Sequence, residues 1–149
     1  MTKNLPTFSL PDQDNHIRTS DEFMTNWLVL YFYPKDNTSG CTLEANDFQK
    51  HLNDFTKKQC QIVGVSRDSV RSHQKFYQQQ SLAFTLLSDE NNQLCDAMKT
   101  WVEKSMYGRK YMGIERSTFL YKNGILAKEW RKVKVPNHVM DVLASIDSN

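Results

Sequence analysis

Two hydrophobic patterns follow one another in the first third of the chain. Residues 27–33, Trp-Leu-Val-Leu-Tyr-Phe-Tyr, form a continuous apolar run, whose length is typical of a strand buried on both faces. Pro34 ends this run, and residues 35–40 supply turn chemistry. From that point the apolar positions recur every three or four residues, which predicts an amphipathic helix. Its inward positions are Cys41, Ala45, Phe48, Leu52 and Phe55.

The rest of the chain repeats this alternation and then changes. Residues 61–66 and 82–87 predict two further strands, each followed by a helix. Residues 103–115 are expected to form an irregular connection, whereas Asn123-Gly124, between strands expected at 117–122 and 125–130, predicts a type I′ hairpin. A last helix is expected to begin at Pro136. The inward helical positions are Val70, His73 and Phe76, then Leu94, Met98 and Trp101, and finally Val139, Leu143 and Ile146.

The order of these elements predicts the fold class. Strands that alternate with helices indicate an α/β protein whose central sheet is partly parallel, with helices on both faces. The antiparallel hairpin near the end makes the sheet mixed, and a thioredoxin-like sandwich is the simplest arrangement that fits. Residues 8–10 and 16–18 are expected to add a small hairpin near the start. Since no linker or repeat interrupts the chain, we expect residues 1–149 to form a single domain.

Composition and charge exclude several classes of function. The formal net charge is +2, and the basic residues are scattered among acidic ones, so no basic stripe indicates a nucleic-acid partner. No apolar run is long enough to span a membrane, and the first residues lack the apolar core of a signal peptide. The three cysteines, Cys41, Cys60 and Cys95, are an odd number. They favour free thiols in a reducing cytoplasm over a structural disulfide framework.

Cys41 stands where a turn opens a helix. The unpaired N–H groups at such a helix end carry partial positive charge, which stabilises a thiolate, the nucleophilic form of cysteine. Taken alone, a cysteine at this position is more often a buried core residue. Pro34 and Thr38, taken alone, would end the strand and form the turn. Together, at the spacing Pro-x-x-x-Thr-x-x-Cys between a strand and a helix, the three residues favour a reactive site.

This segment resembles the active-site signature of the peroxiredoxins. Residues 31–42, Tyr-Phe-Tyr-Pro-Lys-Asp-Asn-Thr-Ser-Gly-Cys-Thr, are similar to the Q-type subfamily, also called bacterioferritin comigratory protein-like. Residues 65–70, 106–108 and 113–120 also resemble stretches of that subfamily, in the same order. The resemblance runs over nearly the whole chain, from about Leu5 to Leu143.

The resemblance implies a role for five residues. It implies that Cys41 is the peroxidatic cysteine, that Pro34 and Thr38 complete the motif, and that Arg116 is the active-site arginine. Pro34 can shield the sulfur from water, and Thr38 offers a hydroxyl to the peroxide. Arg116 stays cationic and presents a planar fork of donors, although an arginine at the start of an edge hairpin is usually a solvated surface charge. Glu44 corresponds to the group that orients the arginine, and its ordinary role would be favourable charge in the first helical turn.

Three positions depart from the subfamily pattern. Ser39 stands where a proline is usual, and Asn46 and Tyr77 occupy the two positions from which relatives supply a second, resolving cysteine. Cys60 begins a predicted buried strand and is expected to be structural. Cys95 is the remaining candidate for an internal resolving thiol, although a core position is the stronger expectation for it. We therefore predict a one-cysteine cycle that an external thiol completes.

The expected reaction is attack of the Cys41 thiolate on hydrogen peroxide or an organic hydroperoxide, which produces a Cys41 sulfenic acid. The resemblance implies thioredoxin as the reductant, with glutathione and glutaredoxin as the other candidates, and no metal or cofactor. We expect a monomer. Two alternatives use the same fold: a non-catalytic redox sensor, adaptor or holdase, and a thiol-disulfide oxidoreductase, which normally requires the Cys-x-x-Cys motif that this chain lacks.

Overall fold

The computed structural model describes residues 3–24 and 26–147, which are built around a mixed five-stranded sheet. The sheet has the strand order β5-β4-β3-β8-β9. Strands β3, β4 and β5 are parallel, and β8 and β9 run as an antiparallel hairpin beside β3. Their bounds are Trp27–Phe32 for β3, Cys60–Ser66 for β4, Thr85–Ser88 for β5, Ser117–Lys122 for β8 and Ile125–Trp130 for β9. The predicted α/β class with a thioredoxin-like mixed sheet is confirmed.

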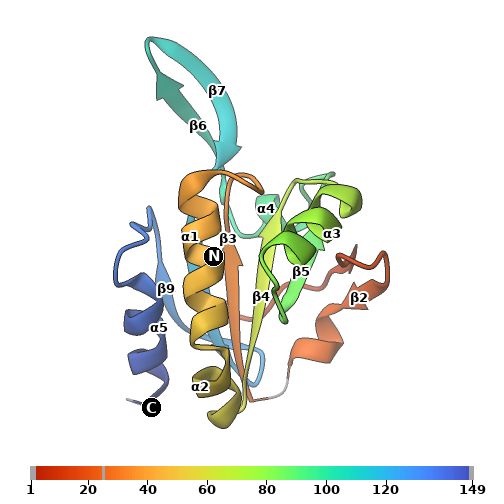
Figure 1. Cartoon of the computed structure of the whole chain (residues 1–149), viewed down its shortest axis with the longest axis vertical. Helices are drawn as coiled ribbons and strands as arrows, with labels where there is room; N and C mark the ends of the chain where they lie inside the picture. Colours follow the sequence, from red (N-terminus) through yellow and green to blue (C-terminus); the bar gives the residue numbers. More distant parts are fainter. Residues whose placement is uncertain (1–2, 25, 148–149) are drawn as a thin grey trace.

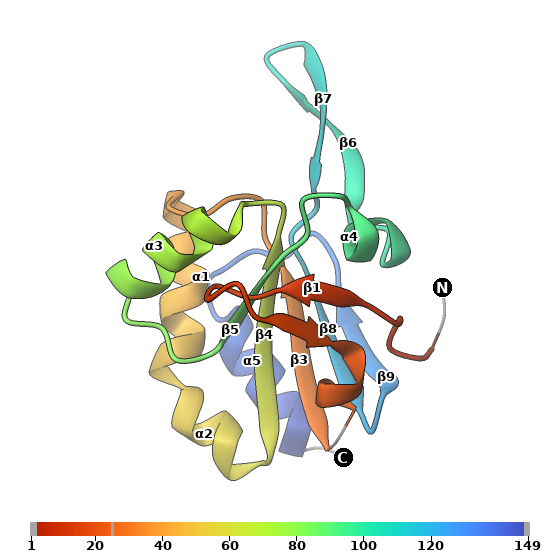
Figure 2. The ribbon, with the colours of Figure 1, turned by 90° about the vertical axis from the view of Figure 1, so that its right-hand side faces the viewer.

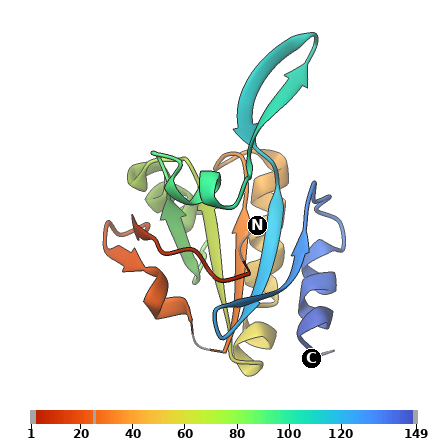
Figure 3. The same ribbon diagram turned by 180° about the vertical axis from the view of Figure 1, so that it is seen from behind.

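Helices cover both faces of this sheet, but not equally (Figure 1). One face carries the longer helices, and the other carries a short helix together with the N-terminal segment (Figures 2 and 3). Each face has its own buried apolar cluster. The first layer consists of α1 (Ser39–Lys50), α2 (Leu52–Lys57), α3 (Val70–Gln79) and α5 (His138–Asp147). The second consists of β1 (Ser9–Pro11), β2 (Ile17–Thr19), the 3₁₀ helix η1 (Ser20–Phe23) and α4 (Gln93–Ala97).

The register of β3 brings two distant segments together. All six residues of β3 are buried, as its continuous apolar run predicts. Phe32, the last residue of β3, lies opposite Ser117, the first residue of β8. Arg116 and the loop that follows β3 therefore meet at the same end of the sheet, although more than seventy residues separate them in sequence.

Residues 103–115 are the main exception to the predicted elements. In place of an irregular connection, they contribute to a two-stranded antiparallel hairpin of β6 (Trp101–Met106) and β7 (Arg109–Ile114). The hairpin rises from the end of the molecule at which α1 begins (Figures 1 and 2). Because most of its side chains are exposed, its sequence lacks the alternation of buried and polar positions that marks a strand. Trp101, expected on the inward face of a helix, is instead the first residue of β6.

Several element boundaries also differ from the predicted ones. The helix expected from Cys41 to Phe55 is divided at His51 into α1 and α2, and α1 begins two residues earlier, at Ser39. β5 begins at Thr85, and Pro136 lies outside α5, which begins at His138. The hairpin at Asn123-Gly124 is confirmed. The φ angles of these two residues are 50° and 80°, both positive as a type I′ turn requires. The small N-terminal hairpin is present as β1 and β2.

Within the described residues, no helix combines the length and the apolar character needed to cross a membrane.

Candidate active site

Cys41 lies in the first turn of α1, where the helix leaves the loop that follows β3. It is the third residue of the helix, and only 2% of its surface is exposed. Thr38 precedes the helix with extended backbone angles, and its carbonyl accepts a hydrogen bond from the N–H of Thr42. The first turn of α1 contains no acidic residue, and the Thr38 side chain does not cap it. The positive end of the helix is therefore not neutralised by a side chain of its own first turn.

Arg116 connects the sulfur to a buried carboxylate. Its Nη2 lies 3.3 Å from Cys41 Sγ, and its Nη1 donates to Glu44 Oε1 at 2.7 Å. Only 17% of the Arg116 side chain is exposed, so it is not the solvated surface charge that its place in the sequence would suggest. Burial acts to lower the pKa of Arg116, but Glu44 and Cys41 outweigh it and raise that pKa above its ordinary value. The guanidinium beside the sulfur therefore remains cationic.

Glu44 is fully buried one turn further along α1. Burial raises the pKa of Glu44 to about 7, although the attraction of Arg116 acts in the opposite direction. Its Oε1 accepts from Arg116, whereas its Oε2 has no hydrogen-bond partner among the described residues. The carboxyl thus holds Arg116 at the sulfur, and it changes its charge near neutral pH.

Gly40 gives Arg116 the space to reach the sulfur. A Cβ atom at this position would lie 3.2 Å from Nη2 of Arg116, closer than side chains normally approach. Sequence reasoning treated Gly40 only as a turn residue. Arg116 comes directly before β8 and is far from Gly40 in sequence, so local sequence carries no signal for this contact.

Pro34 and Thr38 both lie in the loop between β3 and α1. The hydroxyl of Thr38 donates to the carbonyl of Lys35 at 2.8 Å, which leaves its oxygen lone pairs as acceptors. Pro34 is half-buried and lines a cleft of about 300 Å³ between the loop and the base of the β6–β7 hairpin. The other cleft walls are apolar at Trp101, Tyr111, Met112 and Ile114 and cationic at Lys35, Arg67 and Lys104.

Lys104 links this cleft electrostatically to the sulfur. Burial lowers the pKa of Lys104, the positive charge of Arg116 lowers it further, and Cys41 and Glu115 oppose both. A larger cavity of about 390 Å³ lies at the opposite end of the sheet, beside Asn26 and Cys60. None of the candidate site residues lines that cavity, whereas the smaller cleft shares Pro34 with the candidate site.

The other two thiols lie away from Cys41. Cys60 begins β4 and pairs with Trp27, at the far end of β3, a strand whose length is about 20 Å. Cys95 is completely buried in α4, in the apolar cluster on the opposite face of the sheet. Burial raises the pKa of Cys60 to about 12, and burial with the adjacent Asp89 raises that of Cys95 further. All three thiols are free.

The two positions from which relatives supply a resolving cysteine hold other side chains. Asn46 is exposed on α1 and donates to Gln80 Oε1 at 3.2 Å. Tyr77 lies on α3 and packs against the main apolar cluster. Ser39 is the first residue of α1 and is exposed.

His73 is buried, as its inward helical position predicts, and both of its ring nitrogens have hydrogen-bond partners. Sequence reasoning did not identify its partner Asp36, which lies in the loop between Pro34 and Thr38. The two are far apart in sequence, so no local motif could reveal the pair.

Comparison with known proteins agrees with this arrangement. The model of the AhpC/TSA family matches residues 1–128. The chain belongs to this peroxiredoxin family. Peroxiredoxin Bcp of Xanthomonas campestris is 50% identical over 125 residues, which cover 83% of this chain and 78% of that protein. Peroxiredoxin Bcp of Bacillus subtilis is 46% identical over 136 residues, which cover 91% of this chain and 86% of that protein.

Solved structures give the same result. A structure of Xanthomonas campestris peroxiredoxin Q has a TM-score of 0.92 and 43% sequence identity, with 99% of both chains covered. A bacterioferritin comigratory protein from the same organism, described for its alkyl peroxide reduction activity, has a TM-score of 0.90 and 45% identity over 95% of this chain and 90% of its own. The expected Q-type resemblance is confirmed, and so is the expected class of enzyme, a thiol-dependent peroxidase.

Proposed function

We propose that this peroxiredoxin reduces hydrogen peroxide and organic hydroperoxides with Cys41 as the attacking thiolate. The sulfur attacks the terminal oxygen in line with the O–O bond, and that bond breaks as the S–O bond forms. The products are the Cys41 sulfenic acid and, after the leaving oxygen takes a proton, water or an alcohol. The observation that carries this proposal is the 3.3 Å contact between Arg116 Nη2 and Cys41 Sγ.

Arg116 fits two roles in this reaction. Its positive charge favours the thiolate, and its fork of donors can stabilise the negative charge that develops on the breaking O–O bond. Glu44 supports both roles because its Oε1 binds Nη1 and leaves Nη2 directed at the sulfur. The Thr38 oxygen can accept a hydrogen bond from the peroxide, and Pro34 limits the access of water.

The cleft beside Pro34 supports organic hydroperoxides as substrates together with hydrogen peroxide. Its apolar walls at Trp101 and Met112 can take an alkyl group, while the peroxide end reaches toward Cys41.

We propose that an external thiol completes the cycle. It attacks the sulfenic sulfur, releases water and forms a mixed disulfide, which a further thiol then reduces. The placement of Cys60 at the far end of β3 and of Cys95 on the opposite face of the sheet supports this one-cysteine cycle. Thioredoxin, or glutathione with glutaredoxin, is the proposed reductant. We further propose that the chain acts as one monomeric domain in the cytoplasm.

Stopped-flow oxidation of the reduced protein tests the proposal. We expect one equivalent of hydrogen peroxide to oxidise Cys41 much faster than it oxidises a free cysteine. Mass spectrometry with a sulfenic-acid trap should then find the modification on Cys41. A redox sensor or holdase needs no such rate, so oxidation at the rate of a free thiol would favour that alternative. Oxidation first detected at Cys60 or Cys95 would contradict the assignment of Cys41.

A further inference from the structure

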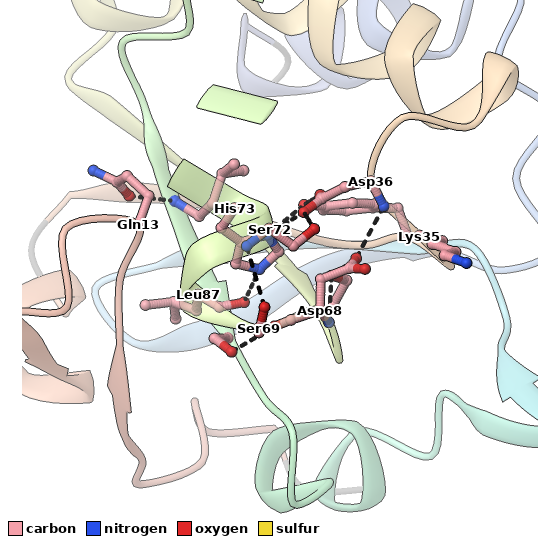
Figure 4. A network of polar contacts seen from close by, with 12 residues as sticks. Gln13, Lys35, Asp36, Asp68, Ser69, Ser72, His73 and Leu87 are labelled. Atoms are coloured by element: carbon pink, nitrogen blue, oxygen red, sulfur yellow. Dashed lines mark hydrogen bonds and ion pairs between the residues drawn. The ribbon is translucent and has the colours of Figure 1, made fainter. Parts of the chain in front are cut away.

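A buried polar network attaches the loop between β3 and α1 to the interior of the protein (Figure 4). Asp36, at the centre of this loop, points away from solvent, and only 1% of its side chain is exposed. Its carboxylate accepts three hydrogen bonds. The donors are the Tyr33 hydroxyl at 2.7 Å, the Ser72 hydroxyl at 2.9 Å and Nδ1 of His73 at 2.7 Å. Asp36 is thus attached to Tyr33, the residue that follows β3, and to α3.

The backbone of Asp36 is held as well. Its N–H donates to Asp68 Oδ2 at 2.9 Å, and the same carboxylate oxygen accepts from the hydroxyl of Ser66. Ser66 is the last residue of β4, so this second attachment connects the loop to the neighbouring strand. Asp36 is therefore fixed through both its side chain and its backbone.

His73 is the member of the network that reaches furthest into the core. Its side chain is completely buried, and Nε2 lies 2.9 Å from the carbonyl oxygen of Leu87 in β5. A carbonyl oxygen only accepts, so Nε2 must carry a hydrogen. Nδ1 is bonded to Asp36 Oδ2 at 2.7 Å, so both ring nitrogens are occupied. His73 therefore links the loop to β5.

This pair does not indicate a metal site. Potential ligand atoms of Asp36, Asp68 and His73 lie within 4.8 Å of one another. Each of those atoms already has a hydrogen-bond partner within the protein, and both ring nitrogens of His73 are occupied. The group is complete as a hydrogen-bonded network.

The position of Asp36 connects this network to the reacting atoms. Pro34 is two residues before Asp36, and Thr38 is two residues after it. The Thr38 hydroxyl bonds to the carbonyl of Lys35, the residue directly before Asp36. A displacement of Asp36 would therefore move both Pro34 and Thr38 relative to the sulfur of Cys41.

We propose that His73 is a positioning residue for peroxide reduction, which acts through Asp36 to hold Pro34 and Thr38 in place around Cys41. The inference rests on the proposed function, in which these loop residues receive the peroxide. His73 touches neither substrate nor sulfur. Its contribution is to keep the loop in the one arrangement that the reaction requires, since small displacements of positioning groups slow a reaction strongly.

Comparison of two reactions of Cys41 tests this role. In His73→Phe, the rate constant for oxidation by hydrogen peroxide should fall by about 10-fold to 100-fold. Alkylation of the same thiol by iodoacetamide needs the thiolate but not the arrangement of the loop. Because Arg116 still lies beside the sulfur, the rate constant for alkylation should change by no more than about 3-fold. Hydrogen exchange at the Asp36 amide should become faster. His73→Gln, which keeps one amide donor group, should fall between wild type and His73→Phe in both oxidation and exchange.

A matched control separates positioning from general destabilisation. Phe55→Leu alters a completely buried residue of α2, a helix at the opposite end of the sheet from the loop (Figure 1). It should lower stability without slowing oxidation. If His73→Phe does not fold, Ser72→Ala removes a different donor to Asp36 and should slow oxidation by about 3-fold to 10-fold, with alkylation retained.

Two results would overturn the proposal. One is oxidation of His73→Phe, or of Ser72→Ala in its place, at the wild-type rate. The other is a fall in the oxidation rate that is accompanied by an equal fall in the alkylation rate, or that the Phe55→Leu variant shows to the same extent. Failure of the proposed function would look different, because wild-type Cys41 would itself react no faster than a free thiol.

Discussion

The β3–α1 and β5–α4 units contain the same local arrangement around a cysteine. In each unit a parallel strand is followed by a loop and a helix, and a cysteine is the third residue of that helix. The surroundings of the two thiols differ. Arg116 donates to the sulfur of Cys41, whereas Cys95 lies beside the carboxylate of Asp89. The same element order thus places one thiol next to a cation and the other next to an anion.

The two helix ends also differ in how their N–H groups are used. At α4, Asp89 Oδ2 accepts from the N–H of Leu94 at 3.0 Å and from that of Cys95 at 2.7 Å. A carboxylate therefore already neutralises this helix end. At α1, no acidic residue occupies the first turn, and the Thr38 side chain donates back to the loop instead. Under the proposed function, the charge beside the cysteine, and not its place at a helix start alone, distinguishes the reactive thiol from the other one.

Loss of the thiol at α1 should have the largest effect. In Cys41→Ser, peroxide turnover should fall by on the order of 10³-fold or more, because the hydroxyl of serine is a far weaker nucleophile at neutral pH. A coupled assay with an external thiol reductant measures this. Cys60→Ser is the control and should keep its turnover. It changes a buried thiol at the start of β4, at the end of the sheet opposite to Cys41. Turnover retained in Cys41→Ser would refute the assignment of the nucleophile.

Loss of the cation beside Cys41 should have the next largest effect. In Arg116→Ala, oxidation of Cys41 should slow by about 10²-fold to 10³-fold, which is the usual effect of removing one donor to a developing negative charge. Arg116→Lys should recover only part of this loss, because a point charge cannot bind both Glu44 and the peroxide as a planar fork does. Arg18→Ala removes an arginine of β2, in the layer on the opposite face of the sheet from Cys41, that is also paired with carboxylates, and it serves as the control. Stopped-flow oxidation at wild-type rates in Arg116→Ala would show that the cation is not required.

Titration of the buried Glu44 carboxyl should have a smaller effect, which is a change in the free energy of unfolding with pH. Its pKa is about 7 in the folded protein, above its ordinary value of 4.5. Between these two pH values the folded state keeps a proton that the unfolded state has released. The free energy of unfolding should therefore fall as pH rises from 4.5 to 7, by on the order of 3 kcal/mol, and then stay level. Below pH 4.5 both states are protonated, and the contribution is constant.

Urea denaturation of Glu44→Gln at a series of pH values checks this. Glutamine does not titrate, so the variant should lack the part of the decline that Glu44 causes. Glu103→Gln removes an exposed carboxylate of β6 and should leave the decline unchanged. Parallel curves for wild type and Glu44→Gln would contradict the assignment.

Sequence reasoning recovered the inner strands of the central sheet because they are buried, and the mostly exposed β9 because of the turn before it. The apolar run from Trp27 to Phe32 and the Asn123-Gly124 turn each have a local signature, and both elements are present. The β6–β7 hairpin has no such signature, because it extends from the body and most of its side chains face solvent. Its turn at Tyr107-Gly108 has positive φ angles of 51° and 79°, but an exposed strand gives no periodic pattern to support the turn.

Some residues of the candidate site could also be predicted from the sequence, and others could not. Cys41, Glu44 and Arg116 were identified through the family resemblance, and the structure brings their side chains into contact. The pairing of His73 with Asp36 could not be read, because it depends on how α3 packs against the loop. Long-range contacts of this kind depend on packing and leave no spacing pattern in the sequence.

Loss of the thiol at α4 should have the smallest effect. Cys95→Ser should keep wild-type peroxide turnover with an external thiol reductant, because Cys95 lies in the apolar cluster on the opposite face of the sheet from Cys41. A disulfide requires the two Cα atoms to approach within about 7 Å, which the intervening sheet prevents unless α4 leaves its place. Non-reducing peptide mapping after one equivalent of peroxide should find Cys41 oxidised or joined to the external thiol, and Cys95 unmodified. A Cys41–Cys95 linked peptide formed within one chain, with turnover lost in Cys95→Ser, would instead establish a two-cysteine cycle. It would also mean that the thiol beside Asp89 reacts despite its anionic surroundings, which would end the contrast between the two helix starts.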